Sequence, residues 1–152
     1  MRQDEVYLFW RPSHDCTSDQ YSTVSPLLTS TSQAICHCLD CRKLSSSAFS
    51  TALLVPSSNF HFEAGAPVKT VDLKHHIDGI DMTPHFCGNC GSWMCKTADD
   101  DRFRGMHIVM AGTLDTEDGQ DSKVTAPQAE LWTKYRLDWV KPLEVKQCVG
   151  FE

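Results

Sequence analysis

The sequence predicts a mainly β fold, organised as a single compact domain of short antiparallel strands over residues 1–152. Short segments rich in β-branched, aromatic and aliphatic residues recur along the chain, and Gly, Pro, Ser and Asp separate them. No stretch repeats its apolar residues with the period of a long amphipathic helix. At 152 residues, one domain can bury roughly two thirds of the surface that the unfolded chain exposes.

The expected strands follow from local composition. They cover residues 5–10, 49–55, 59–63, 68–73 and 106–111. Pro12 and Pro56 lie where the first two of these should end, because proline donates no hydrogen bond to a sheet. Residues 74–83 are polar and predict a loop, whereas the pattern of residues 129–135 fits a helix or a strand.

Charge and hydropathy exclude several classes of partner. The chain has 20 acidic against 14 basic side chains and a net charge of −6, which argues against a nucleic-acid partner, since such domains carry a basic stripe. No apolar run reaches the roughly 18 residues of a membrane span, so no membrane partner is expected. Residues 1–6 contain no apolar signal region, so we expect reduced cysteines and a cytoplasmic location. The sequence makes no prediction of oligomeric state.

Three cysteines, Cys36, Cys38 and Cys41, fall within six positions. In an extended segment, the one-residue gap puts the first two thiols on the same side. A turn after Leu39 and Asp40 would then bring Cys41 to join them. Three converging thiolates are a ligand set for a soft or borderline metal, and Zn²⁺ is the usual one.

A second motif lies downstream, Cys87-x-x-Cys90 followed by Gly91. In such a knuckle the backbone amides turn towards the second sulfur, and glycine supplies the positive φ that this turn often needs. The two motifs predict that the strands fold around zinc knuckles.

Spacing alone leaves two ligand assignments open. In the first, Cys38-x-x-Cys41 and Cys87-x-x-Cys90 close one tetrahedral site, and the chain is a non-catalytic interaction module resembling a zinc ribbon. In the second, Cys36, Cys38 and Cys41 hold one Zn²⁺ with an open fourth position, typical of catalytic sites. Cys87 and Cys90 then complete another site with ligands from elsewhere. The close upstream pair available for it is His14 and Cys16.

The pattern of both motifs resembles the glutathione-dependent formaldehyde-activating enzyme family, which includes centromere protein V. The resemblance rests on Cys-His-Cys-x-x-Cys-Arg-Lys at residues 36–43 and on Phe-Cys-x-x-Cys-Gly-Ser at residues 86–92. Glu-Leu-Trp at residues 130–132 and Asp-Trp-Val-Lys-Pro at residues 138–142 are similar to the closing segment of that family. The resemblance covers about residues 14–142.

The resemblance implies a mainly β fold with two zinc sites. Cys36, Cys38 and Cys41 match the three-cysteine catalytic site of the family, while Cys87 and Cys90 match half of its structural site. In the family, the other half is an upstream Cys-x-Cys followed by Gly. Here residues 14–17 read His-Asp-Cys-Thr, in which His14 and Cys16 remain acceptable ligands because histidine can replace a thiolate on zinc. Ser46 stands where the family commonly has Gly.

The ligand chemistry and the resemblance together predict the function. Three thiolates on Zn²⁺ leave a net charge of −1, so the metal is a weak Lewis acid that suits a sulfur ligand. The resemblance adds the reaction class, a zinc-dependent carbon–sulfur lyase. It would act on glutathione, as co-substrate, or on a thiol adduct of a small electrophilic metabolite, with one or two Zn²⁺ per chain.

Each of the other polar residues near the first motif has two possible interpretations, a functional role or an ordinary structural one. Arg42, Lys43 and Ser45 are candidates for substrate binding, although solvent-exposed cations are the alternative for the first two. His37 is a catalytic candidate, although in an extended segment it should face away from the metal. His75 and His76, further along, are expected to be solvated residues of a polar loop, with a contribution to the rim of a pocket as the alternative.

Overall fold

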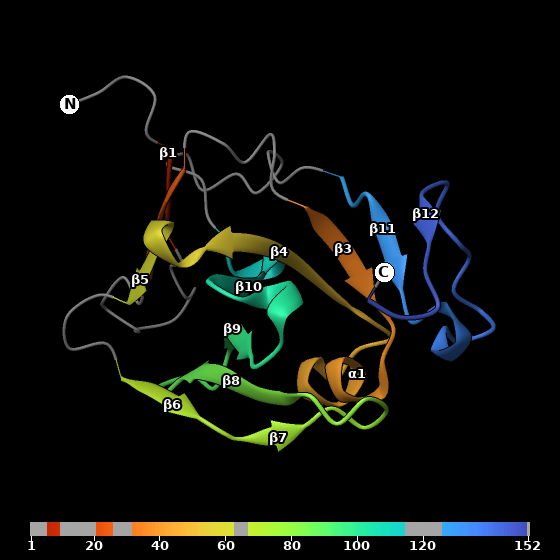
Figure 1. The fold of residues 1–152 in the computed structure, drawn as a ribbon. Helices are drawn as coiled ribbons and strands as arrows, with labels where there is room; N and C mark the ends of the chain where they lie inside the picture. The colour runs from red at the N-terminus through yellow and green to blue at the C-terminus, as the bar shows by residue number, and fades with distance from the viewer. Residues whose placement is uncertain (1–5, 10–20, 26–31, 63–66, 115–125, 152) are drawn as a thin grey trace.

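The computed structural model describes residues 6–9, 21–25, 32–62, 67–114 and 126–151. Its architecture is mainly β, which confirms the predicted fold class (Figure 1). The larger sheet contains nine strands: β3 (Gln33–Cys36), β4 (Ser50–Pro56), β6 (Val68–Thr70), β7 (Leu73–Lys74), β8 (Asp81–Cys87), β9 (Trp93–Ala98), β10 (Met106–Met110), β11 (Ala129–Leu131) and β12 (Lys146–Gln147). Their order is β12-β11-β3-β4-β10-β9-β8-β6, and β7 also pairs with β8.

A smaller antiparallel sheet and short helical segments complete the described fold. The sheet consists of β1 (Val6–Phe9), β2 (Tyr21–Ser25) and β5 (Phe60–Phe62). The α-helix is α1 (Leu39–Ser45), and the 3-10 turns are η1 (Ser57–Asn59), η2 (Asp101–Phe103), η3 (Ala111–Thr113) and η5 (Thr133–Tyr135). In Figure 1, α1 follows β3 at the end of the larger sheet where β7 and β8 also lie.

Most strand pairs are antiparallel as expected, but β11 runs parallel to both of its neighbours, β3 and β12. Leu131 is the register partner of Cys36, and the Leu131 carbonyl oxygen accepts a 3.0 Å hydrogen bond from the amide of His37. The segment that follows β11 is therefore held beside the first cysteine motif, although about 95 residues separate them in the sequence.

Several predicted elements have the expected type. The strands predicted at residues 5–10, 49–55, 59–63 and 106–111 correspond to β1, β4, β5 and β10. The segment 129–135, which fitted either helix or strand, is β11 followed by η5, with Trp132 between them at φ 57°.

One local prediction is wrong, and another holds in a different form. The loop predicted at residues 74–83 is shorter at both ends, because Lys74 ends β7 and Asp81 begins β8. These two residues are cross-strand partners joined by an ion pair, so tertiary pairing extends both strands into a polar sequence. The turn predicted after Leu39 is the first turn of α1. Its N-cap is Cys38, and cysteine is not among the residues that normally announce a helix start.

The larger sheet buries apolar side chains on both faces, because successive residues of a strand point to opposite sides. Leu53 and Val109 belong to a cluster with Val55, Phe60, Cys87, Met94, Cys95, Ala111 and Leu114. Their strand neighbours, such as Ile108 and Met110, pack in a second cluster with Cys36, Cys38, Cys41, Trp93 and Trp132. The first cysteine motif is thus built into one of the two packed faces.

Within the described ranges, no helix is both long enough and apolar enough to span a membrane.

Candidate functional site

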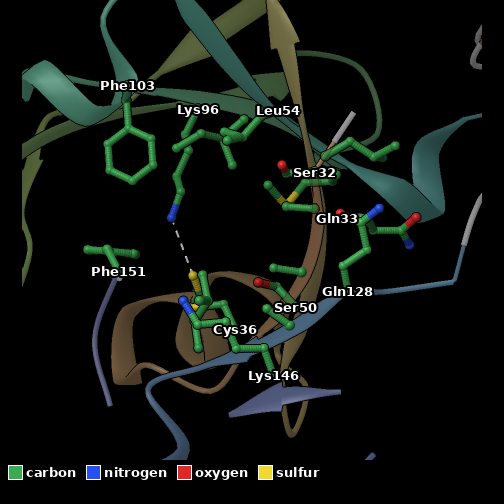
Figure 2. Close-up of a pocket in the computed structure, with 18 residues that line it drawn as sticks. Ser32, Gln33, Cys36, Ser50, Leu54, Lys96, Phe103, Gln128, Lys146 and Phe151 are labelled. Carbon is green, nitrogen blue, oxygen red and sulfur yellow. Dashed lines mark hydrogen bonds between the residues drawn. The ribbon is translucent and has the colours of Figure 1, made fainter. Parts of the chain in front are cut away.

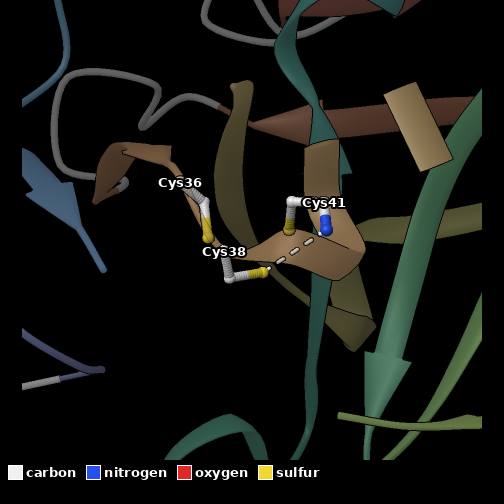
Figure 3. Close-up of side chains that lie close together, drawn as sticks. All are labelled: Cys36, Cys38 and Cys41. Atoms are coloured by element: carbon white, nitrogen blue, oxygen red, sulfur yellow. Dashed lines mark hydrogen bonds between the residues drawn. The ribbon is translucent and has the colours of Figure 1, made fainter. Parts of the chain in front are cut away.

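Cys36, Cys38 and Cys41 form a thiol cluster at the junction of β3 and α1 (Figure 3). Cys36 is the last residue of β3, Cys38 caps α1, and Cys41 lies in the first turn of the helix. The three sulfur atoms lie within 4.8 Å of one another, and all three side chains are buried. The Cys38 Sγ also accepts a 3.3 Å hydrogen bond from the amide of Cys41, which fixes the start of the helix.

The thiol cluster fits a tetrahedral metal ion. With Zn–S bonds of about 2.3 Å, two sulfurs on one Zn²⁺ are about 3.8 Å apart, so small side-chain shifts would close this cluster on an ion. The cluster includes neither Cys87 nor Cys90. The arrangement favours the assignment in which the three upstream cysteines share a metal over a ribbon that combines both motifs.

A buried lysine stands against the thiol cluster. The Lys96 side chain comes from β9, is only 4% exposed, and places its Nζ 3.3 Å from the Sγ of Cys41. Burial alone would lower the pKa of the Lys96 ammonium, but attraction to the thiolates of Cys41, Cys36 and Cys38 raises it above the ordinary value. The cation is therefore retained inside the protein by the negative charge of the cluster.

The thiols of the cluster differ in their pKa values. Hydrogen bonds from Cys36 and Cys38, together with attraction to Lys96, hold the pKa of Cys41 well below its usual range. The pKa of Cys36 is raised well above its usual range by interactions with the two other thiols and by burial. One thiolate is thus stabilised by one ammonium, and a divalent cation would displace the protons of the other thiols.

A cavity of about 370 Å³ opens beside the thiol cluster (Figure 2). Cys36, Cys41 and Lys96 line it, so the cluster and its counter-charge border the same space. In Figure 2, Phe103 and Phe151 lie on one side and Gln33 and Gln128 on the other. Other residues that line the cavity include Ser50, Ala52, Leu54, Ile108, Met110 and Lys146. The wall is largely apolar with a few polar groups, as is usual in small-molecule sites.

The residues predicted to bind substrate do not line this cavity. Arg42 donates a 3.3 Å hydrogen bond to the carbonyl oxygen of Tyr135, and Ser45 donates one of 2.7 Å to the carbonyl oxygen of Cys41 within the helix. Lys43 is exposed. The side chains of Arg42 and Ser45 thus contact the backbone of η5 and α1.

His37 lies between two predicted ligands but contacts other groups. Its ring is fully buried, meets Phe49 edge-on at 5.8 Å, and places Nε2 3.7 Å from Oε1 of Glu130. Burial lowers the pKa of the imidazole, against the opposing effect of Glu130. His37 does not line the cavity.

The second cysteine motif forms the turn between β8 and β9. Gly91 has φ +77°, its amide donates to the carbonyl oxygen of Cys87 at 2.9 Å, and the amide of Cys87 donates to Ser92 at 2.9 Å. Cys87 is buried whereas Cys90 is exposed. The predicted partners His14 and Cys16 lie outside the described residues, so their position beside this turn remains a prediction.

Sequence reasoning missed two buried charged or ionisable side chains near the thiol cluster. Lys96 had one available signal, a single cation inside the otherwise apolar start of a strand that follows a cysteine knuckle. The expectation that His75 is solvated is wrong. Its side chain is fully buried, with its ring 5.1 Å from that of Trp132 and 5.2 Å from that of Phe151.

The sequence was compared with models of known protein families and with curated proteins. The family model described as glutathione-dependent formaldehyde-activating enzyme matches residues 13–135, which is most of the chain. The chain belongs to this family. No curated protein matches the chain. Family membership links it to enzymes that use glutathione, and the thiol cluster could hold a metal.

Proposed function

We propose that this family member is a zinc-dependent enzyme of the carbon–sulfur lyase type, acting on glutathione or on a thiol adduct of a small electrophilic metabolite. One observation carries the proposal: Cys36 and Cys41 belong to the buried thiol cluster and also line the cavity of about 370 Å³. The same side chains that would hold the metal therefore border a space of the size that small-molecule sites have.

Cys36, Cys38 and Cys41 would hold the Zn²⁺. When bound by three thiolates, Zn²⁺ supplies an open coordination position with a preference for a sulfur ligand. The ammonium of Lys96 offsets the remaining negative charge, which makes this charged unit compatible with burial. These groups bind and orient a thiol, while the apolar wall of the cavity limits the access of water to the reacting carbon.

The reaction we propose is balanced without a redox partner. In the forming direction, the S–H bond of the thiol breaks, a bond forms between sulfur and the carbonyl carbon of an aldehyde, and the proton ends on the carbonyl oxygen. In the reverse direction the carbon–sulfur bond breaks, the carbonyl group forms again, and the proton returns from oxygen to sulfur. Ser50 has a buried hydroxyl at the cavity wall beside Cys41, and its interaction with that thiol helps to lower the pKa of Cys41. We assign it to hold the proton at that oxygen.

Glutathione would need polar contacts away from its sulfur. Gln33, Gln128 and Lys146 border the cavity and carry groups that suit the amides and carboxylates of a tripeptide. Gln33 and Gln128 lie opposite Phe103 and Phe151, so a bound thiol compound would have one polar and one apolar neighbour (Figure 2).

A second zinc site is part of the proposal. Cys87 and Cys90 would contribute two ligands from the β8–β9 turn, and His14 and Cys16 would contribute the others. The seven cysteines within the described ranges are free of disulfides, which supports a reducing location such as the cytoplasm. The alternative function, a non-catalytic zinc-ribbon-like interaction module, is less well supported because Cys87 and Cys90 do not join the thiol cluster.

The direct test is turnover of a thiol adduct. Nuclear magnetic resonance exchange spectroscopy with glutathione and ¹³C-labelled aldehydes of increasing size measures adduct formation and cleavage in the same sample. We expect wild type to accelerate exchange for at least one aldehyde, and Cys41→Ser to lose that acceleration while circular dichroism shows an intact fold. Unchanged exchange in Cys41→Ser would refute the assignment of this site.

A matched control separates this effect from the loss of any buried thiol. Cys95 is a fully buried cysteine of the opposite face of the sheet, and Cys95→Ala should keep the acceleration. Measured zinc content adds an independent check. Two Zn²⁺ per chain, with one lost in Cys41→Ser, fits the enzyme, whereas a single Zn²⁺ and a freely alkylated Cys36 fits the ribbon.

A further inference from the structure

We infer that Cys38, Asp40 and His75 form a metal position of their own, here called the second metal position, which adjoins the thiol cluster, shares Cys38 with it and is separate from the zinc site proposed at Cys87 and Cys90. One ligand atom from each of the three residues lies within 4.8 Å of the other two. Cys38 and His75 are fully buried, and Asp40 is half-buried at the start of α1. The inference concerns metal binding alone and does not depend on the proposed reaction.

The imidazole of His75 is oriented as metal-binding histidines are. Its Nδ1 lies 2.6 Å from Oδ1 of Asp78, so the proton belongs on Nδ1 and the lone pair on Nε2. A ligating histidine almost always donates its other ring N–H to a carboxylate, a carbonyl or water. The Asp78 carboxylate fills that role here.

The other nitrogen of His75, Nε2, is buried and makes no hydrogen bond with any of the described residues. It lies 4.0 Å from Oδ2 of Asp40, which is too long for a hydrogen bond. Two ligand atoms on one tetrahedral Zn²⁺ are separated by roughly 3.3–3.6 Å when they are an N–O, N–S or O–S pair. The 4.0 Å between His75 and Asp40 is therefore closer to the separation of two zinc ligands than to that of a hydrogen-bonded pair.

Two backbone hydrogen bonds close the turn that carries His75. The amide of His75 donates to the carbonyl oxygen of Ile80 at 2.8 Å, and the amide of Gly79 donates to the carbonyl oxygen of His75 at 3.0 Å. Gly79 takes φ +70°, which glycine adopts without strain. The ring packs against Trp132 and Phe151. The turn thus fixes the imidazole before any ion arrives.

Asp40 retains coordination capacity despite its own contacts. Its Oδ2 accepts hydrogen bonds from the amide and from Nδ1 of His76, at 2.9 and 2.7 Å. An ionised carboxylate has about four lone-pair sites, so two accepted bonds leave room for a cation. Mixed thiolate, carboxylate and imidazole ligands suit Zn²⁺ or another borderline divalent ion.

The second metal position differs from the thiol cluster in its surroundings. Cys36 and Cys41 line the cavity, whereas Asp40 and His75 do not. Cys38 stands between the two positions and is the one cysteine of the thiol cluster outside the cavity wall. A cation held by Asp40 and His75 would therefore sit away from the substrate space and would share its thiolate with the cluster.

Cobalt titration of two variants tests the inference. The double variant Cys36→Ser/Cys41→Ser removes two ligands of the cluster but keeps Cys38, Asp40 and His75. We expect Co²⁺ to bind there with a sulfur-to-cobalt charge-transfer band of single-thiolate intensity. Adding His75→Ala should weaken this binding by at least about tenfold. The Cys87 and Cys90 pair is common to both variants, so the difference between their titrations isolates the second position.

Two further variants guard against loss of fold. His107→Ala, which removes a histidine from the opposite face, should leave the titration unchanged in the double variant. Asp78→Asn leaves the His75 ring in place but weakens its orientation, and should lower Co²⁺ affinity roughly 10–100-fold. In a double variant whose circular dichroism shows the wild-type fold, binding that neither His75→Ala nor Asp78→Asn weakens would overturn the inference. The absence of a single-thiolate band in the difference between the two titrations would also overturn it. If the wild-type protein shows no turnover of a thiol adduct, that result refutes the proposed function and leaves the inference about metal binding unaffected.

Discussion

The Nζ of Lys96 lies 3.3 Å from the Sγ of Cys41, and both side chains are almost fully buried. A buried cation is retained when its partner remains charged, and it becomes strongly destabilising when that partner is lost. The pair therefore links the charge on the thiol cluster to the packing of β9 against α1.

Lys96→Met should destabilise the zinc-loaded protein more than the zinc-free one. With zinc bound, the three thiolates cannot take up protons, so removal of the ammonium leaves a buried negative charge and should cost about 3–5 kcal/mol of unfolding free energy. Without zinc, Cys41 can take up a proton and the loss should be smaller. Urea denaturation with and without a chelator measures both values, and equal losses would contradict the role of Lys96 as counter-charge.

The two cysteine motifs and most strands were predictable from the sequence because their signals are local. The spacing of Cys36, Cys38 and Cys41 predicted the convergence that the structure shows. The helix that carries Cys41 was not predicted, because a seven-residue helix capped by a thiol has no recognisable start signal. Placement of His14 and Cys16, and the single-domain organisation, stay predictions.

The contacts that complete the site come from tertiary pairing, and the local sequence does not show which residues will meet. Lys96 reaches Cys41 because β10 pairs with β4 in the sheet and β9 pairs with β10 on its other side. His75 is buried by Trp132 and Phe151, which are more than 55 residues away in the sequence. A polar local sequence therefore predicted solvent exposure for a ring that the C-terminal segment covers.

Ala52→Leu should weaken substrate binding without affecting the metal. Ala52 is a small residue of the cavity wall on β4, and a larger side chain there would occupy space that the substrate needs. Overpacking of this kind costs roughly 1–3 kcal/mol, so we expect KM for the thiol adduct to rise at least about fivefold with kcat little changed. Kinetics and zinc analysis of the variant, with Thr51→Val as control outside the cavity wall, provide the measurement. An unchanged KM would place the substrate elsewhere.

Gly88→Ala should destabilise the cysteine knuckle. The amide of Gly88 donates a hydrogen bond to the carbonyl oxygen of Pro67, and a Cβ on Gly88 would overlap that same oxygen. Because the obstacle is backbone, the turn itself must move, at a cost of about 1–3 kcal/mol. Gly112→Ala is the matched control, since a Cβ there meets nothing within 4 Å. Thermal unfolding should show a clear loss for the first variant and little for the second. Similar midpoints for the two would show that the knuckle tolerates displacement.

Glu130→Ala should be strongly destabilising, because Glu130 is a buried carboxylate that ties the C-terminal segment to β3. Arg136 donates a hydrogen bond to it, the amide of Leu143 donates another of 3.3 Å, and His37 lies 3.7 Å away. Glu130 is 1% exposed and Arg136 is 20% exposed, so the pair is only slightly screened by solvent. Removing one partner of a buried pair costs about 3–5 kcal/mol, and we expect about 3 kcal/mol here since Arg136 keeps some contact with water.

An exposed ion pair of the same protein supplies the comparison for Glu130. Lys74 and Asp81 are 70% and 61% exposed, and their Nζ to Oδ1 distance is 2.5 Å. Exposed pairs contribute about 0–1 kcal/mol, so Asp81→Ala should lower the free energy of unfolding by less than about 1 kcal/mol. Chemical denaturation of both variants under one set of conditions gives the two losses directly. Because the Asp81 pair is short yet exposed, a large loss for Glu130→Ala alone would show that burial, and not distance, decides the contribution of each pair.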